Sequence, residues 1–173
     1  MDSEEEFTAG FYSTAERLVR LLIDRSLYLA VSESCTGGLV ADALTRVSGA
    51  SSCFWGSFVC YTPRAKMQML GVGEHTLSTY GPVSEETARE MAAGALEKSG
   101  ADAAVSVTGL AGPEGDGSAV PVGTVWIAAA LRSEETERKL STFAGEFHFS
   151  GNRNEVRLQA ARETIIQITE LLK

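Results

Sequence analysis

Residues 27–38 combine a short apolar run with a small polar turn, and this combination limits the folds open to the chain. The run over 27–32 predicts a buried strand, and the apolar pattern over 39–47 predicts a helix. Between them lies Ser-Cys-Thr-Gly-Gly at 34–38, which is typical of neither element. We therefore expect a tight strand-to-helix turn, and this is the first place to look for chemistry.

Further helices and strands alternate along the rest of the chain. Apolar residues with helical spacing predict helices from Phe11 to near Arg25, from Ser84 to Gly100, and over 158–172. Apolar or β-branched runs predict strands over 54–61, 103–107, 122–131 and 140–149, the last two as a hairpin across polar residues 132–138. Helix-linked strands together with a hairpin indicate an α/β fold with a mixed sheet and helices on its faces.

Length and charge limit the domain organisation and the partners. A chain of 173 residues with 44% hydrophobic content forms one well-buried core, so we expect a single domain over 1–173, with 1–10 as a potentially disordered start. The net charge of −8, with fifteen scattered Lys and Arg, repels polyphosphate. We therefore expect no nucleic-acid partner, whereas a small anionic ligand held by one or two arginines fits.

Cysteine and histidine usage argues against a metal site or a disulfide framework. The three cysteines are odd in number and form no CxxC pair, and only His75 and His148 could join them as soft ligands. The N-terminus lacks a basic region followed by an apolar run, and no segment approaches the ~20 apolar residues that span a bilayer. We expect a soluble, unprocessed cytoplasmic protein with no membrane partner.

The turn at 34–38 offers the first candidate site. Ser34, Cys35 and Thr36 place two hydroxyls and a thiol beside the first amides of a helix, where the helix dipole favours a phosphate or a developing oxyanion. Gly37 and Gly38 complete the turn. Two alternatives stay open: the turn is plain helix capping, and Cys35, whose pKa a helix N-terminus lowers, rivals Ser34 as nucleophile unless it is buried and inert.

Tyr61 and Lys66 form a second candidate pair. Thr62 and Pro63 predict an N-cap and first residue of a short helix, so Tyr61 ends a strand and Lys66 lies about one turn into the helix. Desolvation and a nearby cation would lower the pKa of such a lysine towards that of a useful base. The alternatives are a solvated surface lysine and a half-buried strand tyrosine.

Two further segments could bind a ligand. The loop over 108–117 contains four glycines in ten residues, which implies unusual backbone angles or close approach to a ligand near Thr108, Gly109 and Gly112. Arg153 follows Ser-Gly-Asn and precedes the last helix, so helix-end amides and a guanidinium could bind a phosphate together. Arg153 could equally pair with Glu155 or solvent.

Six blocks in this order resemble the C-terminal domain family of the competence/damage-inducible protein CinA. They are Ser-Glu-Ser-Cys-Thr-Gly-Gly at 32–38, Tyr-Thr-Pro-Arg-Ala-Lys at 61–66, Gly-Pro-Val-Ser-Glu at 81–85, Val-Thr-Gly-Leu-Ala-Gly-Pro at 107–113, Pro-Val-Gly-Thr-Val-Trp at 121–126 and Phe-Ser-Gly-Asn-Arg at 149–153. The resemblance covers roughly residues 12–170. It implies a three-layer α/β/α fold without the N-terminal domain of longer relatives, and often a homo-oligomer.

The same resemblance implies an amidohydrolase that converts nicotinamide mononucleotide to nicotinic acid mononucleotide and ammonia, without metal or organic cofactor. It places the catalytic roles on Ser34 as nucleophile and Lys66 as base, with Tyr61 at the matching tyrosine position. We expect substrate binding by the turn amides, the glycine loop and a phosphate-binding arginine, that is by Cys35, Thr36, Gly37, Gly38, Thr108, Gly109, Gly112 and Arg153.

Two departures from the family pattern remove charge near the expected ligand. Asn152 stands where an aspartate is usual, and Val120 stands where a lysine often precedes the Pro-Val-Gly block. Two alternatives therefore stay open: weaker binding of the phosphate, or a different substrate such as a nicotinamide-like riboside. The competing class of function is a nucleotide-binding module without turnover, linked to competence or DNA-damage response.

Overall fold

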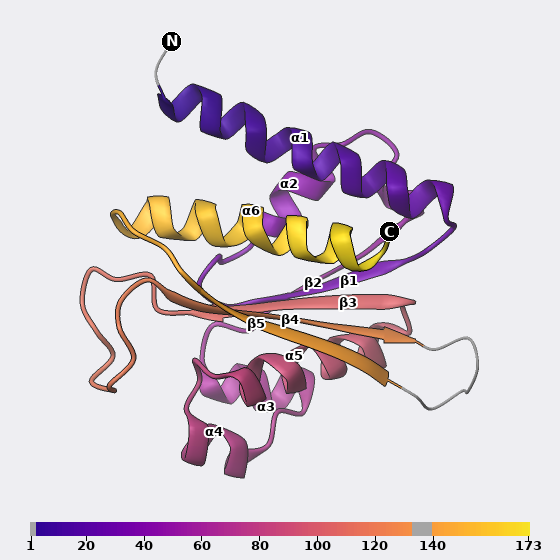
Figure 1. The fold of residues 1–173 in the computed structure, drawn as a ribbon. Coiled ribbons are helices and arrows are strands. Elements are labelled where there is room, and N and C mark those ends of the chain that lie inside the picture. The colour runs from indigo at the N-terminus through magenta and orange to yellow at the C-terminus, as the bar shows by residue number, and fades with distance from the viewer. Residues whose placement is uncertain (1–2, 133–139) are drawn as a thin grey trace.

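A five-stranded sheet between two layers of helices forms the core of the molecule (Figure 1). The computed structural model describes residues 3–132 and 140–173, so most of the polar connection predicted over 132–138 lies outside the described residues. The elements in chain order are α1 (Ser3–Asp24), β1 (Leu29–Glu33), α2 (Leu39–Thr45), the 3₁₀ turn η1 (Ala50–Ser52), β2 (Phe54–Val59), α3 (Pro63–Leu70), α4 (Glu74–Tyr80), α5 (Glu85–Ser99), β3 (Ala103–Gly109), β4 (Thr124–Arg132), β5 (Leu140–His148) and α6 (Arg153–Leu171).

The sheet is mixed, as predicted. Its strand order is β2-β1-β3-β4-β5, with β1 parallel to both β2 and β3, and with β4 antiparallel to β3 and β5. The pairing of β4 with β5 confirms the predicted hairpin. The carboxyl ends of β1, β2 and β3 therefore share one edge of the sheet.

Helices cover both faces of this sheet, which confirms the three-layer α/β/α class. One layer contains α1, α2 and α6, and the other contains α3, α4 and α5 (Figure 1). Successive residues of β1 alternate between the two cores: Leu29 and Val31 belong to the first core, and Ala30 belongs to the second. All five residues of β1 are buried, so this strand is covered on both faces.

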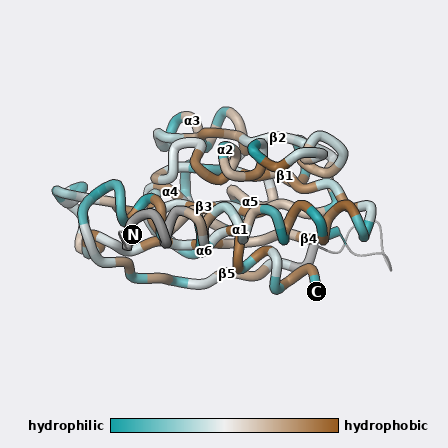
Figure 2. Tube along the Cα trace, turned by 90° about the horizontal axis from the view of Figure 1, so that it is seen from above, coloured by the Kyte–Doolittle hydropathy of each residue, from teal (hydrophilic) through white to brown (hydrophobic). Residues whose placement is uncertain are grey.

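The predicted apolar helix faces are buried where the sequence placed them. The residues of the α1 stripe are at most 1% exposed: Phe11, Ala15, Leu18 and Leu22. Along the trace of α1, hydrophobic and hydrophilic stretches alternate (Figure 2). This helix begins at Ser3, so it includes much of the segment for which disorder was considered. The predicted face of α5 is also buried: Ala88, Met91, Ala92, Ala95 and Leu96.

Local capping signals correctly set the starts of α3 and α5. Thr62 accepts a hydrogen bond from the amide of Ala65 and Pro63 opens α3, while Ser84 caps α5. Asn152 and Glu155 form a reciprocal capping box at the start of α6. Asn152 thus performs the capping role that an aspartate could also perform.

Helix α4 was not predicted, because it carries little apolar periodicity. Only Thr76 among its residues is buried. A carboxylate from another helix stabilises its first turn: Glu90 of α5 accepts from the amide of Gly73 at 2.7 Å and from the hydroxyl of Thr76 at 2.6 Å. The signal for α4 is therefore a tertiary contact and does not show in the local sequence.

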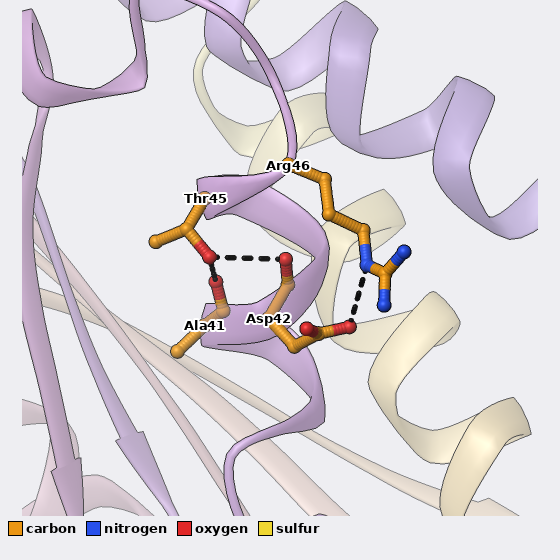
Figure 3. A network of polar contacts seen from close by, with 4 residues as sticks. All are labelled: Ala41, Asp42, Thr45 and Arg46. Atoms are coloured by element: carbon orange, nitrogen blue, oxygen red, sulfur yellow. Dashed lines mark hydrogen bonds and ion pairs between the residues drawn. The ribbon is translucent and has the colours of Figure 1, made fainter.

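Helix α2 is short and is stabilised by hydrogen bonds within its last turn and by a contact with α1. On its exposed side, Arg46 donates to the carboxylate of Asp42, and Thr45 donates to the carbonyls of Ala41 and Asp42 (Figure 3). The guanidinium of Arg46 also lies over the ring of Tyr12 of α1, 4.8 Å from its centroid. These contacts fix the helix that follows the Ser34 turn.

Candidate active site

The Ser34 turn lies where the connections of two neighbouring strands diverge. From β1 the chain continues through α2 to β2 on one side, whereas from β3 it continues to β4 on the other side. The amide of Ser34 donates to the carbonyl of Val107 at 3.0 Å, so the turn starts directly beside β3. In open α/β sheets, ligands bind at such a switch point, outside the carboxyl ends of the strands.

Glu33, which was quoted within a family block but was not predicted as a site residue, organises this turn. Its side chain is fully buried at the end of β1. Its two carboxylate oxygens accept five hydrogen bonds, from the hydroxyls of Thr36 and Ser57 and from the amides of Gly38, Val40 and Ala41. The carboxylate therefore occupies the positive end of α2 as an internal anion.

This arrangement corrects part of the expectation for the turn, because the amides of Gly37 and Gly38 already have partners within the protein and are not open to a phosphate or an oxyanion. The amide of Gly38 is bonded to Glu33, and the amide of Gly37 donates to the carbonyl of Ser34 at 3.1 Å. The hydroxyl of Thr36 is also bonded to Glu33. The available signal was an acidic residue directly before the turn, since an anion at a helix N-terminus stabilises that helix.

Arg157 of α6 is a second residue that was not predicted for the site. Its Nε donates to the carbonyl of Cys35 at 3.1 Å, and its Nη2 donates to the carbonyl of Thr36 at 2.9 Å. The arginine thus ties the last helix to the turn after β1. Only the folded chain brings these residues together, since more than 120 positions separate them.

Lys66 is buried, so the alternative of a solvated surface lysine is wrong. Its side chain is 1% exposed, and its Nζ donates to the carbonyl of Cys60 at 3.0 Å. The amide of Cys60 in turn donates to the carbonyl of Glu33 at 2.7 Å, which places this lysine near the end of β1. Burial lowers the pKa of Lys66 to about 8, although nearby Cys60 and Cys35 oppose the shift.

The environment of Cys35 favours the inert alternative for its thiol. Burial raises the pKa of Cys35 to about 12, and the positive charge of Lys66 offsets only part of that effect. A thiol with such a pKa stays protonated near neutral pH and is a weak nucleophile. The charge of Lys66 therefore acts on Cys35, which is the residue next to Ser34. The side chain of Ser34 is itself 7% exposed.

Arg153 connects the end of β2 to the loop after β3. Its Nη2 donates to the hydroxyl of Tyr61 at 2.8 Å, and its Nη1 donates to the carbonyl of Gly112 at 2.5 Å. Tyr61 lies beyond the end of β2 and is 58% exposed, so it is not a half-buried strand residue. The start of α6 and the loop after β3 share one end of the sheet (Figure 1).

Protein packing accounts for the other predicted residues of the glycine loop. Thr108 is buried, and its hydroxyl donates to the carbonyl of Pro82 at 2.7 Å. A Cβ at Gly109 would lie 2.8 Å from the carbonyl oxygen of Thr124, and one at Gly112 would lie 2.6 Å from Cγ1 of Val122. Gly112 also has a φ of +79°. These glycines allow the loop to approach its own neighbouring backbone and side chains.

Two absences among the described residues concern metal binding and membrane spanning. Across residues 3–132 and 140–173, no group of three or more His, Cys, Asp or Glu side chains is arranged to hold a metal ion. Within the same ranges, no helix is both long and apolar enough to cross a membrane.

Fold and site together define an α/β protein with a polar turn at the switch point of a mixed sheet and a buried lysine beside it. The chain belongs to the CinA C-terminal domain family, whose profile matches residues 11–172. The sequence resemblance is thereby confirmed.

Relatives and solved structures agree with this assignment. Over 134 residues, the chain is 47% identical to a protein of Enterobacter agglomerans named nicotinamide-nucleotide amidohydrolase PncC, covering 78% of each. It is 41% identical to a CinA-like protein of Chlorobaculum tepidum, covering 90% of this chain and 37% of that protein. The structure of competence/damage inducible protein CihA from Agrobacterium tumefaciens matches with a TM-score of 0.87 and 39% identity, over 95% of this chain and 96% of that one.

The chain spans only about a third of the CinA-like relatives it matches. It covers 37% of the Chlorobaculum tepidum protein and 30% of a CinA-like protein from Chloroherpeton thalassium. The match to the amidohydrolase of Enterobacter agglomerans differs, because there most of both chains align.

Proposed function

We propose that the protein is an amidohydrolase that converts nicotinamide mononucleotide to nicotinic acid mononucleotide and ammonia. The observation that carries this proposal is the buried Lys66 amine beside the Ser34 turn. A lysine with a pKa of about 8 is neutral in about a quarter of molecules at pH 7.5, so it can act as a base. The similarity to the named amidohydrolase supports the reaction class.

In the first half of the proposed reaction, the neutral Nζ of Lys66 takes the hydroxyl proton of Ser34 while Oγ attacks the carboxamide carbon. Collapse of the tetrahedral intermediate breaks the C–N bond. The ammonium of Lys66 returns its proton to the leaving NH₂, which departs as ammonia. The products of this step are ammonia and an ester between Ser34 and the pyridine carboxyl group.

In the second half, Lys66 takes a proton from a water molecule that attacks the ester carbon. The C–O bond to Ser34 breaks, and Oγ recovers its proton from Lys66. The nicotinic acid nucleotide forms as the carboxylic acid, gives its remaining proton to solvent water and leaves as the carboxylate. This sequence needs neither a metal nor a redox cofactor, because every proton and electron pair is exchanged between the two side chains, water and substrate.

Arg153 is the residue we propose for the 5′-phosphate. Its guanidinium presents several N–H donors at the edge of the sheet, and it now bonds neutral acceptors on Tyr61 and Gly112. A phosphate is a better acceptor for a guanidinium than either of these, since both partners are then charged. The loop over 112–117 would lie along the ribose or ring in this arrangement.

The decisive test is ammonia release by the purified protein incubated with nicotinamide mononucleotide. We expect Ser34→Ala to abolish release with the fold retained, and Cys35→Ala to keep most of it. Full activity in Ser34→Ala together with loss in Cys35→Ala would move the nucleophilic role to the thiol. Substrate binding without any release by the wild-type protein would support a binding module instead.

A second comparison tests the phosphate site. Arg153→Ala should raise KM for nicotinamide mononucleotide about tenfold or more and should leave kcat within a few-fold of wild type. The same variant should act on nicotinamide riboside as wild type does, because that substrate has no phosphate. Equal loss on both substrates would remove the phosphate-binding role from Arg153.

A further inference from the structure

Arg157 forms a fork that holds two successive carbonyl groups of the Ser34 turn. Its Nε donates to the carbonyl of Cys35 at 3.1 Å and its Nη2 to the carbonyl of Thr36 at 2.9 Å. A third and longer contact, 3.4 Å, runs from Nη1 to the side chain of Asn154. The orientation of two peptide groups next to the proposed nucleophile therefore depends on one side chain.

Because the peptide group is planar, the bond from Arg157 to the carbonyl of Cys35 also sets the direction of the amide of Thr36. In a trans peptide, the N–H points opposite to the preceding C=O. Both peptide bonds are trans, since the described backbone is cis only between Gly112 and Pro113. Arg157 holds the carbonyl of Cys35, so the amide of Thr36 points away from the guanidinium. The next amide, of Gly37, donates back to Ser34 and closes the turn.

The amide of Thr36 faces only a weak acceptor, the sulfur of Cys35, unlike the amides of Ser34, Gly37 and Gly38. Among the described residues, the amides of Ser34, Gly37 and Gly38 each donate to a carbonyl or a carboxylate, and that of Thr36 donates to neither. It lies near the sulfur of Cys35, because it helps to lower the pKa of that thiol. The charge of Lys66 acts on the same thiol, so both this amide and the amine lie near Cys35.

We propose that Arg157 is a positioning residue that directs the amide of Thr36 towards the oxyanion formed when Ser34 attacks its substrate. The inference rests on the proposed amidohydrolase function and deepens it. A donor fixed before the reaction stabilises the developing charge without reorganisation. The positive guanidinium also polarises the peptide group it binds, which makes the opposite N–H a stronger donor.

The alternative is that Arg157 merely ties α6 to the turn. Such a tie would affect stability, and through a displaced turn it would weaken substrate binding and turnover together. A role in oxyanion stabilisation instead lowers kcat while KM changes little, because the ground-state carbonyl carries little charge. Kinetics separate the two roles.

The test compares Arg157→Ala with Asn154→Ala, which removes only the long third contact. We expect kcat of Arg157→Ala on nicotinamide mononucleotide to fall about 10- to 100-fold, with KM within about threefold, since losing an oxyanion donor costs roughly 10²–10³ in rate. Added guanidinium ion should recover about tenfold of the loss. Asn154→Ala should match wild type, and the pH at which activity rises should not move in either variant.

The results of these assays distinguish the proposed amidohydrolase function from the role proposed for Arg157. If the wild-type protein releases no ammonia, the proposed function fails and this inference falls with it. If wild type is active and folded Arg157→Ala keeps kcat within twofold, loses only KM, or shows no guanidinium recovery, Arg157 has no such role. Should Arg157→Ala not fold, Arg157→Lys keeps the charge but cannot fork to both carbonyls, and wild-type kcat in that variant would equally overturn the inference.

Discussion

The amine of Lys66 donates to the carbonyl oxygen of Cys60 at 3.0 Å and, within residues 3–132 and 140–173, pairs with no carboxylate. A buried ammonium ion with a neutral partner is poorly stabilised, which is why burial lowers the pKa of Lys66 to about 8. The burial of the Lys66 amine therefore affects both the stability of the fold and the role as a base proposed for this lysine.

The first prediction concerns the pH dependence of activity. Because the base form of Lys66 is needed, kcat/KM should rise with pH through a single ionisation near pH 8 and then level off. The measurement is ammonia release under subsaturating substrate from pH 6 to pH 10. A rise that continues to the ordinary lysine value of ~10.4 would show that the working base is not a desolvated lysine.

The second prediction is that Lys66→Met abolishes activity and stabilises the fold. Below about pH 8 the amine is protonated in folded and unfolded chains alike, so the cost of burying the charge is fully present. Between pH 8 and 10.5 the folded chain loses the proton first and the cost fades. After the lost hydrogen bond to Cys60 is counted, we expect a gain of roughly 1–3 kcal/mol below pH 8.

Urea denaturation at pH 7 and pH 10 checks this prediction, with Lys98→Met as the matched control. Lys98 is exposed in the last turn of α5, so its replacement should change stability by at most about 0.5 kcal/mol at either pH. A less stable Lys66→Met protein at pH 7 would contradict the proposed cost of burying the ammonium.

The third prediction concerns the internal anion at α2. Glu33→Ala leaves five donors without their acceptor, so we expect a loss of about 4 kcal/mol or more, or failure to fold. Glu33→Gln keeps one acceptor oxygen and should lose roughly 2–3 kcal/mol. Thermal and chemical unfolding measure both, and Glu16→Gln on the exposed face of α1 is the control. Wild-type stability of Glu33→Ala would exclude an organising role for the carboxylate.

The fourth prediction separates two glycines of the same loop region. Gly109→Ala places a Cβ 2.8 Å from the carbonyl oxygen of Thr124, so the strands must shift, and we expect a loss of roughly 2–3 kcal/mol. Gly115→Ala meets no atom within 4 Å and should stay within about 0.5 kcal/mol of wild type. Equal effects in denaturation experiments would show that close backbone approach does not explain Gly109.

Local signals were sufficient for most of the fold. The mixed sheet, the β4–β5 hairpin and the starts of α3 and α5 follow from periodicity and capping, which depend on residues a few positions apart. Helix α4 was missed, because a glutamate of α5 stabilises it from a distance in sequence. The roles of Ser34, Lys66 and Tyr61, the homo-oligomer and the cytoplasmic location stay predictions.

By itself, the sequence determined where strands, turns and helix caps form, and its ordered blocks identified the family. Only the tertiary structure decided that Lys66 is buried, that Glu33 occupies the amide of Gly38, and that Arg157 holds the turn. The physical reason is that burial and hydrogen bonding at this site join residues from β1, α3 and α6. Their distance in sequence leaves no local pattern, and only the folded sheet brings them to one edge.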